Sequence, residues 1–205
     1  FKLTHEPLAP AHVAFQVPFS TFNEVVSLLQ GAGVMLLEQE NGKYIDYTNN
    51  RKNIYFCDRD GHLLEIIAHE FIREDIITAV NQIGIMYIRE VGFPVPSVQL
   101  FRNWLKENLS MRTDEDKDTF NFVIGGTFHA VVVNEKRPWL PIAMTALAPD
   151  VSLTLGVPDK RFLYKGKTHM FYHHSIPSKQ NAAYSFHLKN TSNVSVSLPR
   201  DLGLI

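Results

Sequence analysis

Residues 54–68 read Ile-Tyr-Phe-Cys-Asp-Arg-Asp-Gly-His-Leu-Leu-Glu-Ile-Ile-Ala, two apolar runs separated by a four-residue polar insert. The insert, Asp58–Gly61, has turn chemistry, because Asp accepts backbone hydrogen bonds and Gly adopts a positive φ without a Cβ penalty. The stretch therefore predicts a tight antiparallel hairpin. In its second strand, the two-residue period places Leu63, Glu65 and Ile67 on one face. A carboxylate between apolar side chains is costly to bury unless a cation or a donor meets it, so Glu65 is the first candidate functional residue.

A second alternating stretch lies upstream, at residues 11–17, which read Ala-His-Val-Ala-Phe-Gln-Val. A strand that begins in His, a helix, two more strands and a last strand that carries Glu resemble one βαβββ module of the glyoxalase/bleomycin resistance/extradiol dioxygenase superfamily, also called the vicinal oxygen chelate superfamily. The resemblance rests on His12-Val-Ala-Phe-Gln-Val and on Tyr55-Phe-Cys-Asp-Arg-Asp-Gly-His-Leu-Leu-Glu65. It implies an α+β fold of repeated βαβββ modules forming half-barrel mixed sheets, in which the first-strand His12 and the last-strand Glu65 bind a divalent metal.

Composition is that of an ordinary globular protein of 205 residues, with 45% hydrophobic and 20% charged residues. The formal net charge of -1 gives no reason to expect nucleic acid or an anionic membrane as a partner. No apolar run approaches the roughly 18 residues that span a bilayer. The single cysteine excludes an internal disulfide framework and fits a reducing compartment, so the expected location is the cytoplasm.

An internal repeat is the best architectural signal in the chain. Apolar residues at helical spacing predict a helix that starts at Ser20 or Thr21 and ends at Gly31 or Gly33. A strand at 34–37 and a polar loop at 38–53 with a strand piece at 44–47 follow. The same order then returns as a strand at 87–95, a helix from Val98 to Leu109, and strands at 120–124, 128–133 and 139–144. The predicted divisions are the end of an upstream module (1–7), a first module (8–70), a linker (71–85), a second, degenerate module (86–157) and an irregular C-terminal extension (158–205).

The two repeats are chemically unequal. Glu90 occupies the place of His12 and can ligate a metal, whereas the place of Glu65 is predicted near residues 140–142, where no side chain can. The resemblance implies a complete site with two ligands from each of two facing modules. The chain thus offers His12, Glu65 and Glu90 without a clear fourth ligand. Either water completes the shell, or the first module pairs with an upstream module or with another subunit's copy, and Glu90 then faces solvent.

One imidazole and carboxylate oxygens suit Zn, Ni, Mn or Fe(II) rather than a thiolate metal. Without the resemblance, the residues favour a backbone hydrogen bond as the role of His12 and an arginine partner for Glu65. The resemblance implies a lyase, isomerase or dioxygenase that acts on a small oxygen-chelating substrate, with Glu65 as the catalytic proton carrier. A dioxygenase is less favoured, because its iron site needs two histidines.

The substrate-binding candidates are Gln16, on the face of His12, and Tyr44 and Tyr47, on the long loop that covers the substrate site in such modules. Compatible substrates include a hydroxythiol or dicarbonyl adduct, a catechol and an epoxide antibiotic. The alternative is a non-catalytic protein that sequesters a hydrophobic small molecule in the cleft between modules, as bleomycin resistance proteins do. A homodimer is compatible with either reading.

Overall fold

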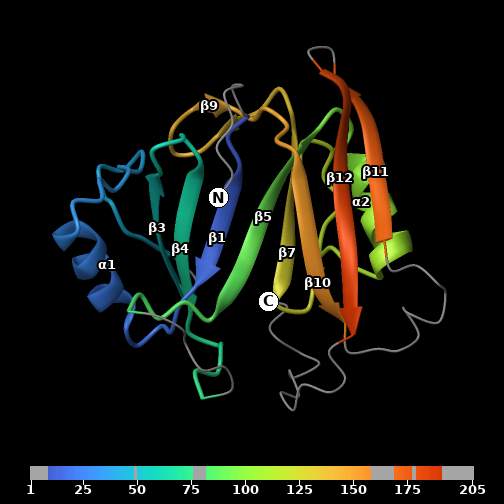
Figure 1. The fold of residues 1–205 in the computed structure, drawn as a ribbon. Coiled ribbons are helices and arrows are strands. Elements are labelled where there is room, and N and C mark those ends of the chain that lie inside the picture. Colours follow the sequence, from blue (N-terminus) through green and yellow to red (C-terminus); the bar gives the residue numbers. More distant parts are fainter. Residues whose placement is uncertain (1–8, 49, 76–81, 158–168, 177–178, 191–205) are drawn as a thin grey trace.

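The computed structural model describes residues 9–48, 50–75, 82–157, 169–176 and 179–190. Its main element is a curved sheet of seven strands in the order β2-β3-β4-β1-β5-β7-β6 (Figure 1). Predictions for residues 1–7 lie outside the described residues, as do those for much of the extension after residue 157. The strands of this sheet are β1 (His12–Gln16), β2 (Asp46–Thr48), β3 (Arg51–Cys57), β4 (Leu63–His69), β5 (Tyr87–Val95), β6 (Phe120–Gly125) and β7 (Phe128–Asn134).

Strand pairing divides this sheet into two similar halves. In the first half, β1 runs parallel to β4, and β4 pairs antiparallel with β3. In the second half, β5 runs parallel to β7, and β7 pairs antiparallel with β6. The halves meet where β1 and β5 pair antiparallel. We call β1–β4 with their helix module one and β5–β7 with their helix module two. The α+β half-barrel architecture expected from the repeat is therefore confirmed.

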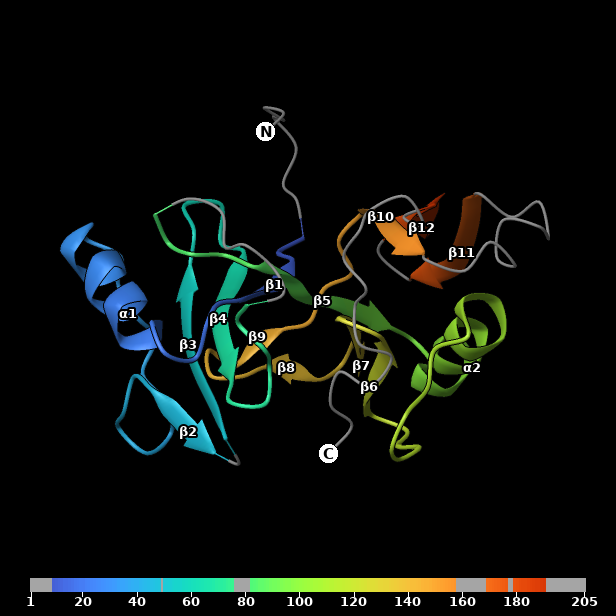
Figure 2. The ribbon, with the colours of Figure 1, turned by 90° about the horizontal axis from the view of Figure 1, so that it is seen from below.

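Helices α1 (Phe22–Gly31) and α2 (Val98–Leu109) pack on the same outer side of the sheet, at its opposite ends (Figure 2). The apolar stripe of α1 is buried against alternate residues of β1, β3 and β4, which form one core cluster. The helix stops where predicted, because Gly33 has a φ of +81° and the Val34 amide donates to the Leu29 carbonyl at 3.0 Å. The opposite side of the sheet, which we call the inner face, is left for other groups.

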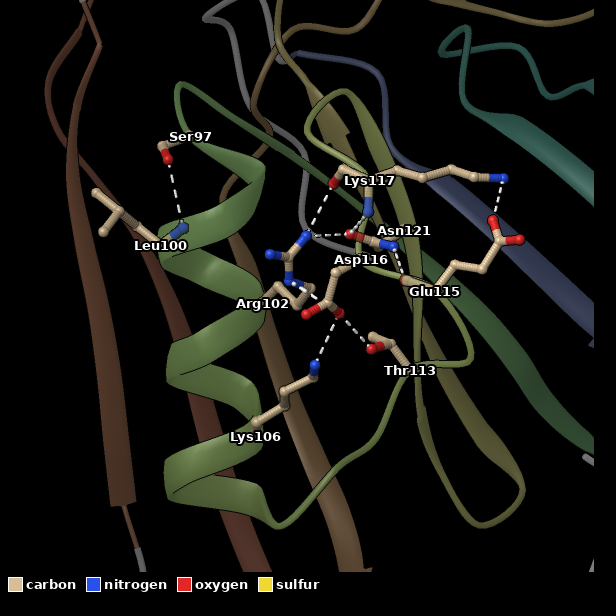
Figure 3. A network of polar contacts seen from close by, with 9 residues as sticks. All are labelled: Ser97, Leu100, Arg102, Lys106, Thr113, Glu115, Asp116, Lys117 and Asn121. Atoms are coloured by element: carbon tan, nitrogen blue, oxygen red, sulfur yellow. Dashed lines mark hydrogen bonds and ion pairs between the residues drawn. The ribbon is translucent and has the colours of Figure 1, made fainter.

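A polar network around Arg102 holds module two together (Figure 3). The Arg102 side chain, only 4% exposed, donates from Nη1 to the Lys117 carbonyl at 2.9 Å and to Asn121 Oδ1 at 2.7 Å. Its Nε lies 3.4 Å from Asp116 Oδ1, and Lys106 Nζ reaches the same oxygen at 2.8 Å. These contacts tie α2 to β6 and to the loop between them.

The chain beyond β7 covers both faces of module two. Strands β8 (Pro138–Trp139) and β9 (Met144–Thr145) form a small hairpin against the inner face, where the continuous strand predicted at 139–144 is interrupted by Pro141, which has no backbone donor. Strands β10 (Val151–Val157), β12 (Lys179–Asn190) and β11 (His169–Ile176) form a second sheet whose Tyr184 and Phe186 complete the α2 core.

One smaller difference from expectation concerns the segment between α1 and β2 of module one. The strand predicted at 34–37 is reduced to one bridge between Leu36 and Phe56. Among the described residues, no helix has the length and apolarity needed to cross a membrane.

Candidate metal centre

His12 opens β1 at the inner face, and its ring is fixed by the neighbouring strand. Parallel pairing places His12 opposite Leu63, and its Nδ1 lies 3.3 Å from the Leu63 carbonyl oxygen. A carbonyl can only accept, so Nδ1 carries the proton and Nε2 keeps a free lone pair. Burial lowers the pKa of His12 to about 4, which keeps the ring neutral near pH 7. A neutral imidazole with a bonded Nδ1 is the state in which histidine binds a metal through Nε2.

Glu65 lies one strand away, with its Oε2 at 3.6 Å from His12 Nε2. Glu65 pairs with Tyr55 of β3 on one side and with Ala14 of β1 on the other, and the small side chain of Ala14 leaves room above the sheet. The Tyr55 hydroxyl donates a hydrogen bond to the carboxylate and opposes the larger effect of burial. Burial and the nearby charge of Glu90 raise the pKa of Glu65 well above its usual range. The side chain is 2% exposed, as its flanking leucine and isoleucine predicted.

Glu90 lies on β5 of module two, where it pairs with Ala14 of β1. The register shifts at this point, so that Arg89 has no partner in β1 and both Arg89 and Glu90 are buried. Burial raises the pKa of Glu90 to about 7, against the lowering effect of the Arg89 and Arg51 charges. His129, paired with Glu90 across β7, has its Nδ1 4.0 Å from Glu90 Oε1.

Ligand atoms of His12, Glu65 and Glu90 all lie within 4.8 Å of one another. Burial raises the pKa of both carboxyls, and the charge of Glu90 raises that of Glu65 further. A divalent cation would cancel both charges and use the free imidazole lone pair. Three protein ligands with a further position open to solvent or substrate are the arrangement of catalytic rather than structural sites. The residues present therefore fit a divalent metal.

A small cavity of about 120 Å³ opens above these three residues. Tyr55 and Glu65 lie side by side in its wall on the module-one side, and the opposite wall is apolar apart from Glu90 and Arg137. The lining residues are His12, Tyr55, Leu63, Glu65, Glu90, Phe120, Phe122, Val131, Val133, Arg137, Pro138, Trp139 and Leu140.

Trp139 of β8 forms part of this wall and packs beside the imidazole, with ring centroids 5.1 Å apart. The indole fits because Gly92 has no side chain: a Cβ there would lie 2.6 Å from Trp139 Cη2 and 2.9 Å from His12 Cβ. The β8–β9 hairpin thus reaches the candidate ligands only because the strand beneath it carries glycine.

Strand register corrects the expected position of the missing fourth ligand. We take Glu90 as the counterpart of His12. Glu65 pairs with Ala14, two residues after His12, and Val131 pairs with Gly92, two residues after Glu90. Val131 is therefore the counterpart of Glu65, rather than residues 140–142. By the same register, Phe122 of β6, which pairs with Val131, is the counterpart of Tyr55, which pairs with Glu65.

Three substrate-binding candidates lie apart from this cavity. Gln16 is fully buried on the inner face, where its Nε2 donates to the Val17 carbonyl at 2.8 Å and its Oε1 lies 2.8 Å from His69 Nδ1. Tyr44 and Tyr47 are 47% and 61% exposed and are not among the lining residues. The structure thus brings together the three predicted ligands but not these three side chains.

Several lining residues were not predicted as metal-site or catalytic residues. Tyr55 could have been found, because antiparallel pairing across the Asp58–Gly61 turn places it opposite Glu65. Trp139 was predicted only as an aromatic of the cleft in the non-catalytic alternative, and Arg137 gave no local signal, since it approaches the site through the fold of the β8–β9 hairpin. A second group of ligand types, Asp58, Asp60 and His62, belongs to the turn itself: Asp58 Oδ1 accepts from the backbone amides of Asp60 and His62.

No family model matches the sequence, and no curated protein matches it either. Solved structures do match. A Bacillus subtilis protein provisionally described as a dioxygenase has 10% identity and a TM-score of 0.53, over 89% of this chain and 63% of that one. The chain thus spans less than two thirds of that protein.

Two further matches are weaker. A lactoylglutathione lyase from Agrobacterium tumefaciens has 12% identity and a TM-score of 0.38, over 53% of this chain and 96% of its own. A 2,2',3-trihydroxybiphenyl 1,2-dioxygenase from Sphingomonas wittichii has 10% identity and a TM-score of 0.31, over 87% and 70%. At these identities, structural likeness is evidence of fold alone. The paired modules and the Bacillus match together assign the chain to the fold of the glyoxalase/bleomycin resistance/extradiol dioxygenase, or vicinal oxygen chelate, superfamily.

Proposed function

We propose that this protein is a metal-dependent enzyme of the glyoxalase or dioxygenase type that acts on a small substrate with two neighbouring oxygen atoms. The observation that carries the proposal is the convergence of His12, Glu65 and Glu90 below one cavity, with their ligand atoms within 4.8 Å of one another. They come from three neighbouring strands, and all are buried. Such placement of ionisable groups is costly unless a cation compensates them.

The donor set narrows the choice of cation and reaction. One imidazole and two carboxylates suit Zn, Ni, Mn or Fe(II). The iron site of non-haem oxygenases uses two histidines and one carboxylate, so the set favours a lyase or isomerase over a dioxygenase. A bound cation would act as a Lewis acid toward the two substrate oxygens.

Side chains of this protein would carry out the proton transfer. The Glu65 carboxylate, which accepts a hydrogen bond from Tyr55, would take a proton from a substrate carbon and return it to the neighbouring one. The Tyr55 hydroxyl orients the carboxylate by its hydrogen bond, and His12 stays neutral because it is buried. Trp139 and the apolar wall exclude water from the reacting atoms.

The second candidate is a non-catalytic binding protein. It is favoured by the apolar module-two wall, where Val131 stands in the place of a fourth ligand and Phe122 in the place of Tyr55. In that function, the cavity would hold a hydrophobic molecule, and the three ligand residues would be a remnant.

Metal analysis of protein purified without chelator tests the proposal. We expect close to one transition metal per chain, falling below about a tenth in His12→Ala and Glu65→Gln, because each variant removes one of three ligands. Glu70→Gln, an exposed carboxylate at the end of β4, is the matched control and should keep full occupancy. Metal-loaded protein should also isomerise a methylglyoxal–thiol hemithioacetal or cleave a catechol. Equal metal contents in all four proteins would contradict the proposal, and metal-free protein that retains a hydrophobic ligand would favour the binding function.

A further inference from the structure

The cavity above the three ligand residues is built for a substrate with two unlike ends. On the module-one side, it offers His12, Glu65 and the Tyr55 hydroxyl. On the module-two side, it offers aromatic and aliphatic side chains: Phe120, Phe122, Val131, Val133, Trp139 and Leu140. Phe122 and Leu140 remain 37% and 51% exposed at this wall, although large apolar groups are stabilised by burial. An apolar body seated against this wall would cover them.

Arg137 is the cation of the cavity wall. Its guanidinium lies over the Phe120 ring, 4.6 Å from the centroid, which holds the charge at the apolar side. Hydrogen bonds from the Arg137 amide to the Asn134 carbonyl and from the Ala146 amide to the Arg137 carbonyl fix its backbone. Within the described part of the chain, no carboxylate oxygen lies within 4.0 Å of this guanidinium. The charge is therefore available to a ligand.

A second group of the same wall also lacks a partner. Trp139 is 6% exposed, and its Nε1–H has no hydrogen-bond acceptor among the residues that the structure describes. Buried N–H groups of this kind are normally satisfied, and a missing acceptor points to water or a bound molecule. Trp139 and Arg137 lie two residues apart in the β8 region, so one ligand can meet both.

We infer that the substrate is a small anionic aromatic compound, whose ring lies against the module-two wall and whose carboxylate pairs with Arg137. Its two neighbouring oxygens face the ligand residues, and an acceptor oxygen takes the Trp139 Nε1–H. The assignment rests on the proposed function for the oxygen end and on Arg137 for the anionic end. The charges of the lining residues agree with it, because Glu65, Glu90 and a divalent cation would sum to zero, and Arg137 would then leave one positive charge at the cavity wall for a monoanion.

The experiment compares four probes by isothermal titration calorimetry. Zinc-loaded protein, in which the metal is redox-inert, is titrated with 3,4-dihydroxybenzoate and with catechol, which differ by one carboxylate. Metal-free protein is titrated with benzoate and benzamide, which compare an anion with a neutral amide and need no metal. Arg137→Gln removes the charge, Arg137→Lys keeps it, and Lys136→Gln is the control, because Lys136 is an exposed neighbouring cation that does not line the cavity.

We expect each acid to bind at least about tenfold more tightly than its neutral counterpart, the usual effect of a charge-assisted hydrogen bond. The preference should vanish in Arg137→Gln, persist in Arg137→Lys and be unchanged in Lys136→Gln. Equal binding of acid and neutral probes to the parent protein, or a preference that survives in Arg137→Gln, would overturn the inference. Should metal binding fail while the benzoate preference depends on Arg137, the proposed function falls and the anion site stands. Circular dichroism of the variants verifies that they are folded.

Discussion

Module one and module two share a strand order, yet the same register positions carry opposite chemistry. Where module one has Glu65 paired with Tyr55, module two has Val131 paired with Phe122. Module one therefore supplies two ligands and a hydroxyl, while module two supplies one ligand and an apolar wall.

The difference extends to how each module is held together. Module two has the Arg102 network and a second sheet packed against α2, whereas α1 is held mainly by apolar contacts with β1, β3 and β4. One repeat can thus keep most of the reactive groups, while the other supplies the apolar wall of the cavity and the contacts that stabilise the fold.

Converting module two toward module one should have the largest effect. Val131→Glu places a third carboxylate beside Glu65 and Glu90, and we expect it to destabilise the metal-free protein by about 3–5 kcal/mol, because an uncompensated buried charge is costly. Added zinc should reverse this loss and bind at least about tenfold more tightly than in the parent. Urea unfolding with and without zinc measures both effects. Val131→Gln is the neutral control. Zinc affinity that does not rise in Val131→Glu would break the assigned equivalence with Glu65.

The two buried carboxyls, Glu65 and Glu90, predict an unusual pH dependence of the stability of the metal-free protein. The folded protein holds protons on Glu65 and Glu90 above the ordinary carboxyl pKa of 4.5, up to about pH 7 for Glu90. Between these pH values, the folded state binds more protons than the unfolded chain, so the contribution of these carboxyls to the free energy of unfolding falls as the pH rises. The lowered pKa values of His12, His69 and His129 act in the opposite direction below pH 6.5.

A substitution isolates the contribution of Glu90. From pH 4.5 to pH 7, the unfolding free energy of Glu90→Gln should gain roughly 3 kcal/mol on that of the parent. The exposed Glu107→Gln serves as the control. A constant difference over this pH range would mean that Glu90 is not buried beside a second carboxyl.

Removing the support of module two should weaken the fold and spare the ligands. Arg102→Ala leaves the Lys117 carbonyl without this donor and removes the shorter of two hydrogen bonds to Asn121 Oδ1, so we expect a loss of about 2–3 kcal/mol in urea unfolding. Metal content should not change, because Arg102 lies on the outer side of the sheet with α2. Glu24→Gln on α1 should have little effect on either measurement. Loss of metal in folded Arg102→Ala would show that support and site are not separate.

Two opposite substitutions compare the small residues that the two modules have on the inner face, Gly92 of β5 and Ala14 of β1. Gly92→Ala forces Trp139 and His12 apart, because its Cβ would lie 2.6 Å from the indole, and we expect a loss of about 1–3 kcal/mol. Ala14→Gly, at the corresponding place in β1, should cost about 1 kcal/mol through lost packing and added chain entropy. Thermal unfolding measures both losses, and Trp fluorescence should shift only in Gly92→Ala. An unchanged fluorescence spectrum would mean that Trp139 does not pack on Gly92.

Local pattern predicted the part of the site that depends on one hairpin and one strand. The period of two predicted that Glu65 faces inward, and the repeat predicted Glu90 in the position of His12. The counterpart of Glu65 could not be located in this way. It depends on which strand pairs parallel with β5, and the apolar stretch 128–134 and the stretch 139–144 look alike until that long-range pairing is known. Arg137 could not be located either, because only the fold brings its hairpin over the inner face.

The most direct measurement is anomalous X-ray diffraction from crystals of zinc-loaded protein, recorded on both sides of the zinc edge. We expect one strong anomalous peak bonded to His12 Nε2 and to carboxylate oxygens of Glu65 and Glu90, with Val131 facing it without contact. Absence of a peak at these residues, or a peak confined to the Asp58–His62 turn, would contradict the proposed metal centre.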